Sequence, residues 1–64
     1  MRYLLSIKEE KVDIDNIIYA SAFIDPNILN VRYINKKLEI NSSKKINLEK
    51  LKKSVKILID RFPR

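Results

Sequence analysis

The sequence predicts an α+β domain: a two-layer sandwich in which a three-stranded antiparallel sheet carries two helices on one face. In three short segments apolar residues alternate with polar ones, which is the period of a half-buried strand. In two longer segments apolar residues recur at steps of three and four, which is the period of a helix. The order along the chain is strand, helix, strand, strand, helix. A two-layer packing lets these elements bury their apolar faces against one another.

The chain has 64 residues, so we expect a single domain over residues 1–64. Hydrophobic residues make up 45% of it, which is sufficient for a core. At roughly 60 residues, folding buries only about 60% of the surface of the unfolded chain. Such a domain is marginally stable alone, and we expect a partner to add to its stability.

The first strand is predicted by Tyr3, Leu5 and Ile7, which alternate with polar residues. The charged run at 8–11 then predicts an exposed connection. No apolar run approaches the about 20 residues of a membrane span, and residues 1–7 are too short for a secretory signal. We therefore expect no membrane partner.

A first helix is predicted to begin after Asp13 or Asp15 and to run to about Ile24. A short side-chain oxygen at either aspartate can accept hydrogen bonds from the free amides of the first turn. Pro26 disfavours helical angles at Asp25, so the helix is expected to stop there.

Two more strands are predicted to form a hairpin around a tight turn. Asn35 tolerates positive φ, so it can form this turn without glycine. A polar loop, 42–45, follows the hairpin. The alternating apolar residues of the two strands are Leu29, Val31 and Tyr33 in the first and Leu38 and Ile40 in the second.

The last helix is predicted over Leu48 to Phe62, with Asn47 as its N-terminal cap and Pro63 ending it. Ile57 lies about 180° from the apolar stripe of this helix. A single exposed isoleucine is ordinary on a protein surface, and the alternative is that it belongs to a docking surface. The stripe consists of Leu48, Leu51, Val55, Leu58 and Phe62, with Ile59 beside it.

The first helix is apolar on two sides. One side carries Ser21 and three isoleucines, at positions 14, 17 and 18, and the other carries Tyr19 and Phe23, which are four residues apart and therefore adjacent. One interpretation is that an aromatic ring packs against the sheet edge or the other helix. The other is that both rings dock onto another protein, because interfaces are rich in aromatic side chains. The small size of the chain favours docking.

Catalysis has little support in the composition. The chain has no Cys, no His and no Gly, so it lacks the common nucleophile, the usual general base and a phosphate-binding glycine loop. The paired acidic residues, Asp13 with Asp15 and Glu9 with Glu10, are better explained by helix capping and by a solvated surface. We therefore expect a non-enzyme with no catalytic residues, no cofactor and no metal site.

The net charge of +6 is concentrated in the second half of the chain. Residues 1–35 carry four basic and five acidic side chains, whereas residues 36–64 carry ten basic and three acidic ones. A basic patch can bind nucleic acid by neutralising phosphates. The alternative is a solvated surface in a chain whose Ile, Lys and Asn content reflects an AT-rich genome. The candidate nucleic-acid-binding residues are Lys36, Lys37, Lys44, Lys45, Lys53 and Lys56, and Lys50 and Lys52 lie beside them.

Taken over nearly its whole length, the chain resembles the Pcc family, the small dimerisation subunits of the KEOPS (EKC) complex. The likeness includes the opening strand, the Ile17-Ile18 pair, the helix exit Phe23-Ile24-Asp25-Pro26 and the closing segment 54–63. The chain has Lys44-Lys45 where the family commonly has Leu-Arg, and Lys53-Ser54 where it often has Asn-Ser. Its hairpin is short, and it lacks the N-terminal extension of the family.

The resemblance implies a non-catalytic scaffold in the cytoplasm, and also in the nucleus of a eukaryote. The complex adds threonylcarbamoyl to an adenosine of tRNA. In the family, two copies or two different small subunits pair through their sheets, and the helices pack against the ATP-binding catalytic subunit. By position, Lys45 would stand near the tRNA path. The residues facing the catalytic subunit would be Tyr19, Phe23, Ile57 and Arg61.

Two other functions remain open from the sequence. One is a stand-alone nucleic-acid-binding module that works through the lysines of the second half. The other is a small accessory domain of a peptide-modification system, because other short strand-helix-strand-strand-helix proteins share this pattern.

Overall fold

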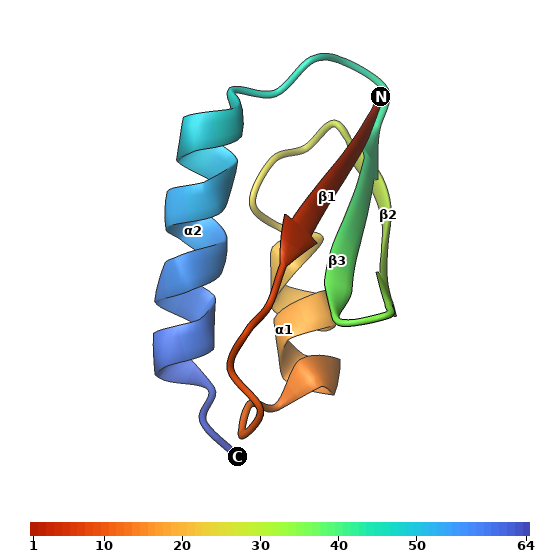
Figure 1. Ribbon diagram of the computed structural model, residues 1–64. Coiled ribbons are helices and arrows are strands. Elements are labelled where there is room, and N and C mark those ends of the chain that lie inside the picture. The colour runs from red at the N-terminus through yellow and green to blue at the C-terminus, as the bar shows by residue number, and fades with distance from the viewer.

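A three-stranded antiparallel sheet forms one layer of the protein, and two helices cover one of its faces (Figure 1). This computed structural model describes residues 1–64 and confirms the predicted α+β fold. The strands lie in the order β1-β3-β2, so the last strand in sequence is the central one. No helix is both long enough and apolar enough to cross a membrane. The elements are β1 (Arg2–Ser6), α1 (Ile14–Ser21), β2 (Ile28–Ile34), β3 (Lys37–Ser42) and α2 (Leu48–Arg61).

The central strand β3 holds the core and pairs with both neighbours. Leu38 and Ile40 point toward the helices and are fully buried. Glu39, between them, points to the opposite face of the sheet, because successive side chains of a strand alternate between faces. The nine buried apolar residues are Leu5, Ile7, Val12, Ile17, Leu38, Ile40, Ile46, Leu51 and Val55.

The prediction for β2 is wrong at one position. Leu29 was expected to face the core with Val31 and Tyr33, but it is 69% exposed. The pairing of β2 with β3 shifts register between Ile28 and Asn30, which marks a β-bulge at Leu29. A bulge inserts one extra residue and breaks the alternation, so Ile28 packs against the core in place of Leu29.

Helix α1 begins as predicted and ends three residues early. The carboxylate of Asp13 caps it by accepting a hydrogen bond from the Asn16 amide at 3.2 Å. Past Ser21 the chain tightens, because the Phe23 amide donates to the Ala20 carbonyl at 3.0 Å and the Ile24 amide donates to the Ser21 carbonyl at 3.2 Å. These bonds span three residues, as in a 3₁₀ turn. The helix therefore stops before the boundary expected from Pro26.

The hairpin between β2 and β3 has the tight turn that was predicted, with two residues at its centre. Asn35 has a φ of 51° and Lys36 a φ of 61°. Positive φ at both central positions is the pattern of a type I′ turn, whose twist matches that of the strands. Asparagine adopts this conformation readily, whereas lysine adopts it at a cost because its Cβ crowds the backbone.

Helix α2 begins at its predicted cap, and the residues after its end are hydrogen-bonded to the segment before α1. The Asn47 side chain accepts from the amides of Glu49 and Lys50 at 2.9 and 3.2 Å. Beyond α2, the Phe62 carbonyl accepts from the Asp13 amide at 2.9 Å, and Val12 pairs with Pro63 in an isolated bridge. Of the predicted apolar stripe, Leu51 and Val55 are buried and Leu58 and Phe62 half-buried, whereas Leu48 in the first turn is exposed.

Replacing Lys36 with glycine should stabilise the protein. Glycine adopts a φ of about 61° without a Cβ clash, and relief of this strain is worth roughly 0.5–1 kcal/mol after the greater freedom of glycine in the unfolded chain is counted. Urea denaturation measures the change. Lys36→Ala is the control, since it removes the charge but keeps the Cβ. An equal gain in both variants would mean that charge, and not backbone strain, limits stability here.

Replacing Ser21 with alanine should also stabilise the protein. Ser21 is fully buried and its hydroxyl has no hydrogen-bond partner in the protein, and burying such a group costs about 1–3 kcal/mol. We expect an increase of about 1 kcal/mol in the free energy of unfolding.

Ser42→Ala is the matched control for this variant. Ser42 is buried too, but its hydroxyl donates to the Lys44 carbonyl at 2.6 Å, so its replacement should destabilise the protein. Destabilisation by Ser21→Ala would contradict the argument.

Candidate interaction surfaces

Two aromatic rings project on the outer side of α1, Tyr19 from the helix and Phe23 from the turn that follows it. The cap at Asp13 and the contacts of Ile17 and Ser21 with the core set the rotation of this helix. Tyr19 and Phe23 lie on the opposite side and are 70% and 73% exposed. Their ring centroids are 5.3 Å apart at an interplanar angle of 62°, an edge-to-face contact. Of the two interpretations of these rings, the one that tucked a ring against the sheet or α2 is therefore wrong.

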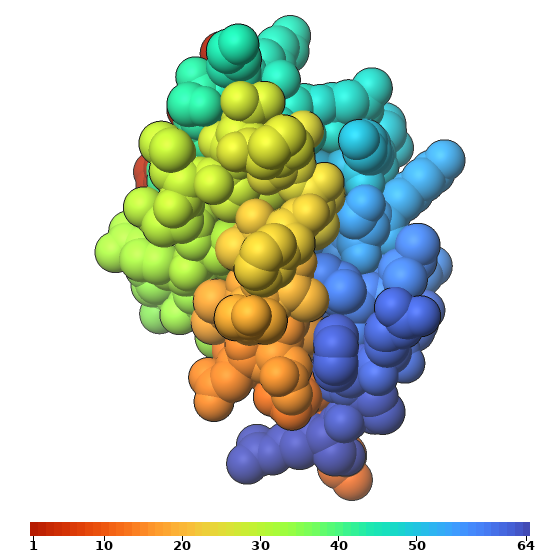
Figure 2. Space-filling view, turned by 180° about the vertical axis from the view of Figure 1, so that it is seen from behind, coloured from red at the N-terminus to blue at the C-terminus, as the bar shows by residue number.

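The outer faces of the two helices form one side of the molecule. Figure 2 shows the surface of α1 in orange between β2 in yellow-green and α2 in blue. Ile57 on α2 is 60% exposed, and Arg61 in the last turn of α2 is exposed as well. We call the set of Tyr19, Phe23, Ile57 and Arg61 the helical surface.

The six candidate nucleic-acid-binding lysines are all exposed but do not gather in one place. Lys36 and Lys37 lie at the hairpin that enters β3, whereas Lys44 and Lys45 lie in the loop that leaves it. At about 3.3 Å per residue, these two pairs are roughly 20 Å apart along the strand. Lys53 and Lys56 lie on α2. None of the six lysines forms an ion pair.

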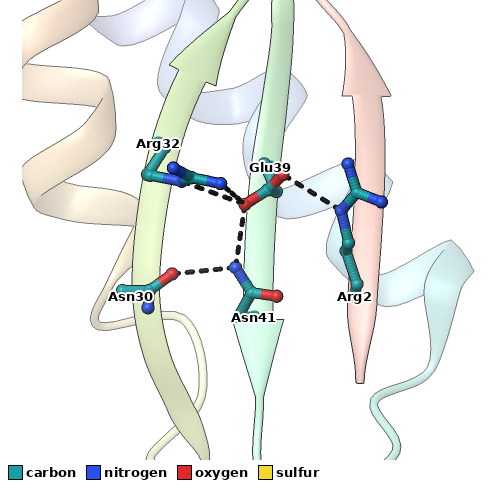
Figure 3. A network of polar contacts seen from close by, with 5 residues as sticks. All are labelled: Arg2, Asn30, Arg32, Glu39 and Asn41. Carbon is teal, nitrogen blue, oxygen red and sulfur yellow. Dashed lines mark hydrogen bonds and ion pairs between the residues drawn. The ribbon is translucent and has the colours of Figure 1, made fainter.

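The open face of the sheet carries a polar network centred on Glu39 (Figure 3). Arg2 on β1 donates from Nε to Glu39 Oε2 at 3.0 Å. On β2, Arg32 donates from Nε at 3.0 Å and from a terminal nitrogen at 2.7 Å, both to Oε1. The side-chain amide of Asn41 donates from Nδ2 to the same oxygen at 3.0 Å and to Asn30 Oδ1 at 2.8 Å.

The network keeps Glu39 ionised although the residue is only 3% exposed. Hydrogen bonds from Arg32 and Asn41, with a smaller one from Arg2, lower the pKa of its carboxyl from 4.5 to about 2 against the opposing effect of desolvation. Hydrogen bonds of this kind favour the charged form of a carboxylate. Three strands therefore meet at one buried charge.

Sequence reasoning missed this network. Arg2 and Arg32 are far apart in the chain and come within reach of Glu39 only because β3 lies between β1 and β2. The available signal was Glu39, a carboxylate between the core residues Leu38 and Ile40 of a predicted strand. Such a carboxylate points to the face opposite the core and, if buried there, needs a positively charged partner.

The acidic residues at and before the start of α1 cap the helix or are exposed. Asp13 caps α1, while Glu9, Glu10 and Asp15 are exposed. No three acidic side chains converge as metal ligands would. Comparison of the chain with models of protein families, with curated proteins and with solved structures gave no match.

Stability should fall in acid because of Glu39. Its folded pKa of about 2 lies below the ordinary 4.5, so its contribution is complete above about pH 4.5 and is lost as the pH falls through 2. Urea midpoints measured between pH 6 and pH 2 test this. Glu39→Gln should lower stability at pH 6 and flatten the decline, whereas Glu10→Gln, on the exposed connection, should leave it unchanged. Parallel pH curves for the wild type and Glu39→Gln would contradict the assignment.

Proposed function

We propose that the chain is a non-catalytic accessory subunit that docks a larger catalytic protein through its helical surface. The more specific form of the proposal is a small subunit of the KEOPS complex, which supports threonylcarbamoyladenosine modification of tRNA in the cytoplasm, and in the nucleus as well in a eukaryote. The observation that carries the proposal is the exposure of both Tyr19 and Phe23, at 70% and 73%.

The size of the two rings supports docking. A fully covered aromatic side chain buries roughly 150–250 Å². Covering what is still exposed of both rings would remove roughly 200–350 Å² from water, worth about 5–9 kcal/mol before the costs of association. A standard interface buries about 800 Å² on each partner, so the rings supply a large part of one.

The character of the helical surface supports a protein partner. Aromatic side chains and arginine are enriched in interfaces, and here two exposed rings, an exposed Ile57 and Arg61 lie on the two helices. The resemblance to the Pcc family assigns the same four positions to the ATP-binding catalytic subunit.

Pairing of two copies, or of two different small subunits, also belongs to the proposal. The strands β1 and β2 are both edges of the sheet, and an edge strand offers unpaired backbone groups to another chain. Pairing through the sheet leaves the helical surface free for the catalytic subunit. Lys45 lies in the loop before α2 and is exposed, which is compatible with a position near bound tRNA.

A stand-alone nucleic-acid-binding module has weaker support. Its lysines are divided between the two ends of β3 and the surface of α2. The exposed rings stand on α1, away from those lysines in the sequence, so they do not interleave with them as base-stacking side chains would. An accessory domain of a peptide-modification system remains the other alternative.

Replacing Tyr19 and Phe23 together with serine should abolish binding to the catalytic partner. The measurement is co-purification of the chain with the ATP-binding KEOPS subunit of the same organism. Because both rings are exposed, circular dichroism and thermal stability should stay close to those of the wild type.

Leu29→Ser is the matched control. Leu29 is 69% exposed, so the variant removes a comparable apolar group from β2 and should leave co-purification intact. Retention of the complex by the double variant would refute docking through the helical surface. If the wild-type chain itself fails to bind that subunit, the KEOPS assignment is wrong.

A further inference from the structure

A groove lies between β1 and α2, separate from the helical surface. It has a volume of about 550 Å³, within the range of roughly 300–1,000 Å³ that is typical of binding pockets. α2 runs alongside β1 (Figure 1), and residues of both elements line the groove. Its apolar lining includes Leu5 from β1 and Val55 and Ile59 from α2.

The edge of β1 at this groove carries unpaired backbone groups. On either side of β1, the Met1 carbonyl accepts from the Ser42 amide at 2.7 Å, and the Ile7 amide donates to the Lys36 carbonyl at 2.9 Å. The backbone amides and carbonyls of odd-numbered residues along this strand therefore point toward β3. Successive residues of a strand point their backbone groups to opposite sides. The amides and carbonyls of Leu4 and Ser6, which both line the groove, therefore point away from the sheet.

The two edges of the sheet differ in regularity. The pairing of β1 with β3 has no register shift from Arg2 to Ser6, whereas β2 is bulged near Leu29. A bulge twists an edge and hinders the addition of a strand. β1 is therefore the edge that can accept a further strand in register along its whole length.

The charge of the groove selects an acidic occupant. Lys8, Lys52 and Lys56 line it, and Glu9 is its only acidic lining residue. All four are exposed and none forms an ion pair. The three ammonium groups are therefore free to pair with carboxylates.

We propose that this groove binds an extended acidic segment of another polypeptide, which adds to the sheet as a fourth strand along β1. Its backbone pairs with the free groups of Leu4 and Ser6. Alternate side chains point toward α2, where apolar ones contact Val55 and Ile59 and carboxylates lie near Lys52. Main-chain bonds supply affinity in this mode of recognition, and side chains supply specificity.

The probe is a synthetic peptide, acetyl-Thr-Val-Thr-Glu-Thr-Val-Thr-Glu-Thr-amide, in which every second side chain is valine or glutamate and both kinds therefore point to the same face of the strand; it is titrated into the isotope-labelled full-length chain. Amide hydrogen exchange followed by NMR should slow at Leu4 and Ser6, because their N–H groups become hydrogen-bonded. The same peptide with lysine in place of glutamate should not bind. Unchanged exchange at Leu4 and Ser6 with the acidic peptide would overturn the proposal.

Lys52→Glu and Lys50→Glu form a matched pair of variants. Both lysines are exposed on the first half of α2, but only Lys52 lines the groove. Lys52→Glu should raise the dissociation constant of the acidic peptide about tenfold or more, and Lys50→Glu by no more than about twofold. Equal losses in both variants would show non-specific attraction to a basic protein and overturn the assignment to this groove.

The free chain provides a further test. If light scattering gives a dimer whose Leu4 and Ser6 amides are already protected, a second copy occupies this edge and the proposal is wrong. If the Tyr19 and Phe23 double variant fails to dock, this test is unaffected, because neither ring lines the groove.

Discussion

The structure depends on β3 being paired on both sides. β1 and β2 have no contact in the sheet except through this strand of six residues. Its inward residues, Leu38 and Ile40, are covered by the helices, so the same strand that joins the sheet also joins the two layers. β3 follows β1 and β2 in the sequence and lies between them in the sheet. The sheet is therefore complete only when this last strand has paired with both of the earlier ones. The pairing of β1 with β3 joins residues far apart in the sequence, from Arg2 with Asn41 to Ser6 with Lys37, whereas the pairing of β2 with β3 is a local hairpin.

That arrangement also decides the character of the open sheet face. A two-layer domain leaves one face of its sheet to solvent, and here arginines from both edge strands meet Glu39 at its centre. Stacking two copies through this face would bring four arginines together and remove the network from water, which is unfavourable. Pairing of sheets edge to edge avoids that cost. The two faces of the molecule therefore differ: the sheet presents a hydrogen-bonded polar network with the exposed Leu4 and Ile34 beside it, and the helical layer presents aromatic rings.

Local patterns in the sequence predicted the local features of the fold. Alternation located the strands, and the side chains of Asp13 and Asn47 located the starts of both helices because capping is a short-range interaction. The helical period placed Tyr19 and Phe23 on one side of the first helix, but it left open whether the rings were covered or exposed. Leu29 was misplaced because a bulge adds one residue without any change in composition. The Glu39 network and the groove were out of reach, since both require the strand order and the packing of α2 beside β1, which no local pattern contains.

The two edge strands of the sheet, unlike the helical surface, must be protected against unwanted pairing with other strands. An unprotected edge strand is a site of unwanted pairing, and proteins protect such edges by bulges, by charges or by a covering element. β2 has a bulge, whereas β1 is regular and has only the basic side chains around it as protection. Lysines at an edge repel a second basic copy but attract an acidic strand. The charge around β1 therefore favours an acidic strand over a second copy at this edge. The regular part of β2, from Asn30 to Ile34, is left as the edge for the proposed pairing of two small subunits.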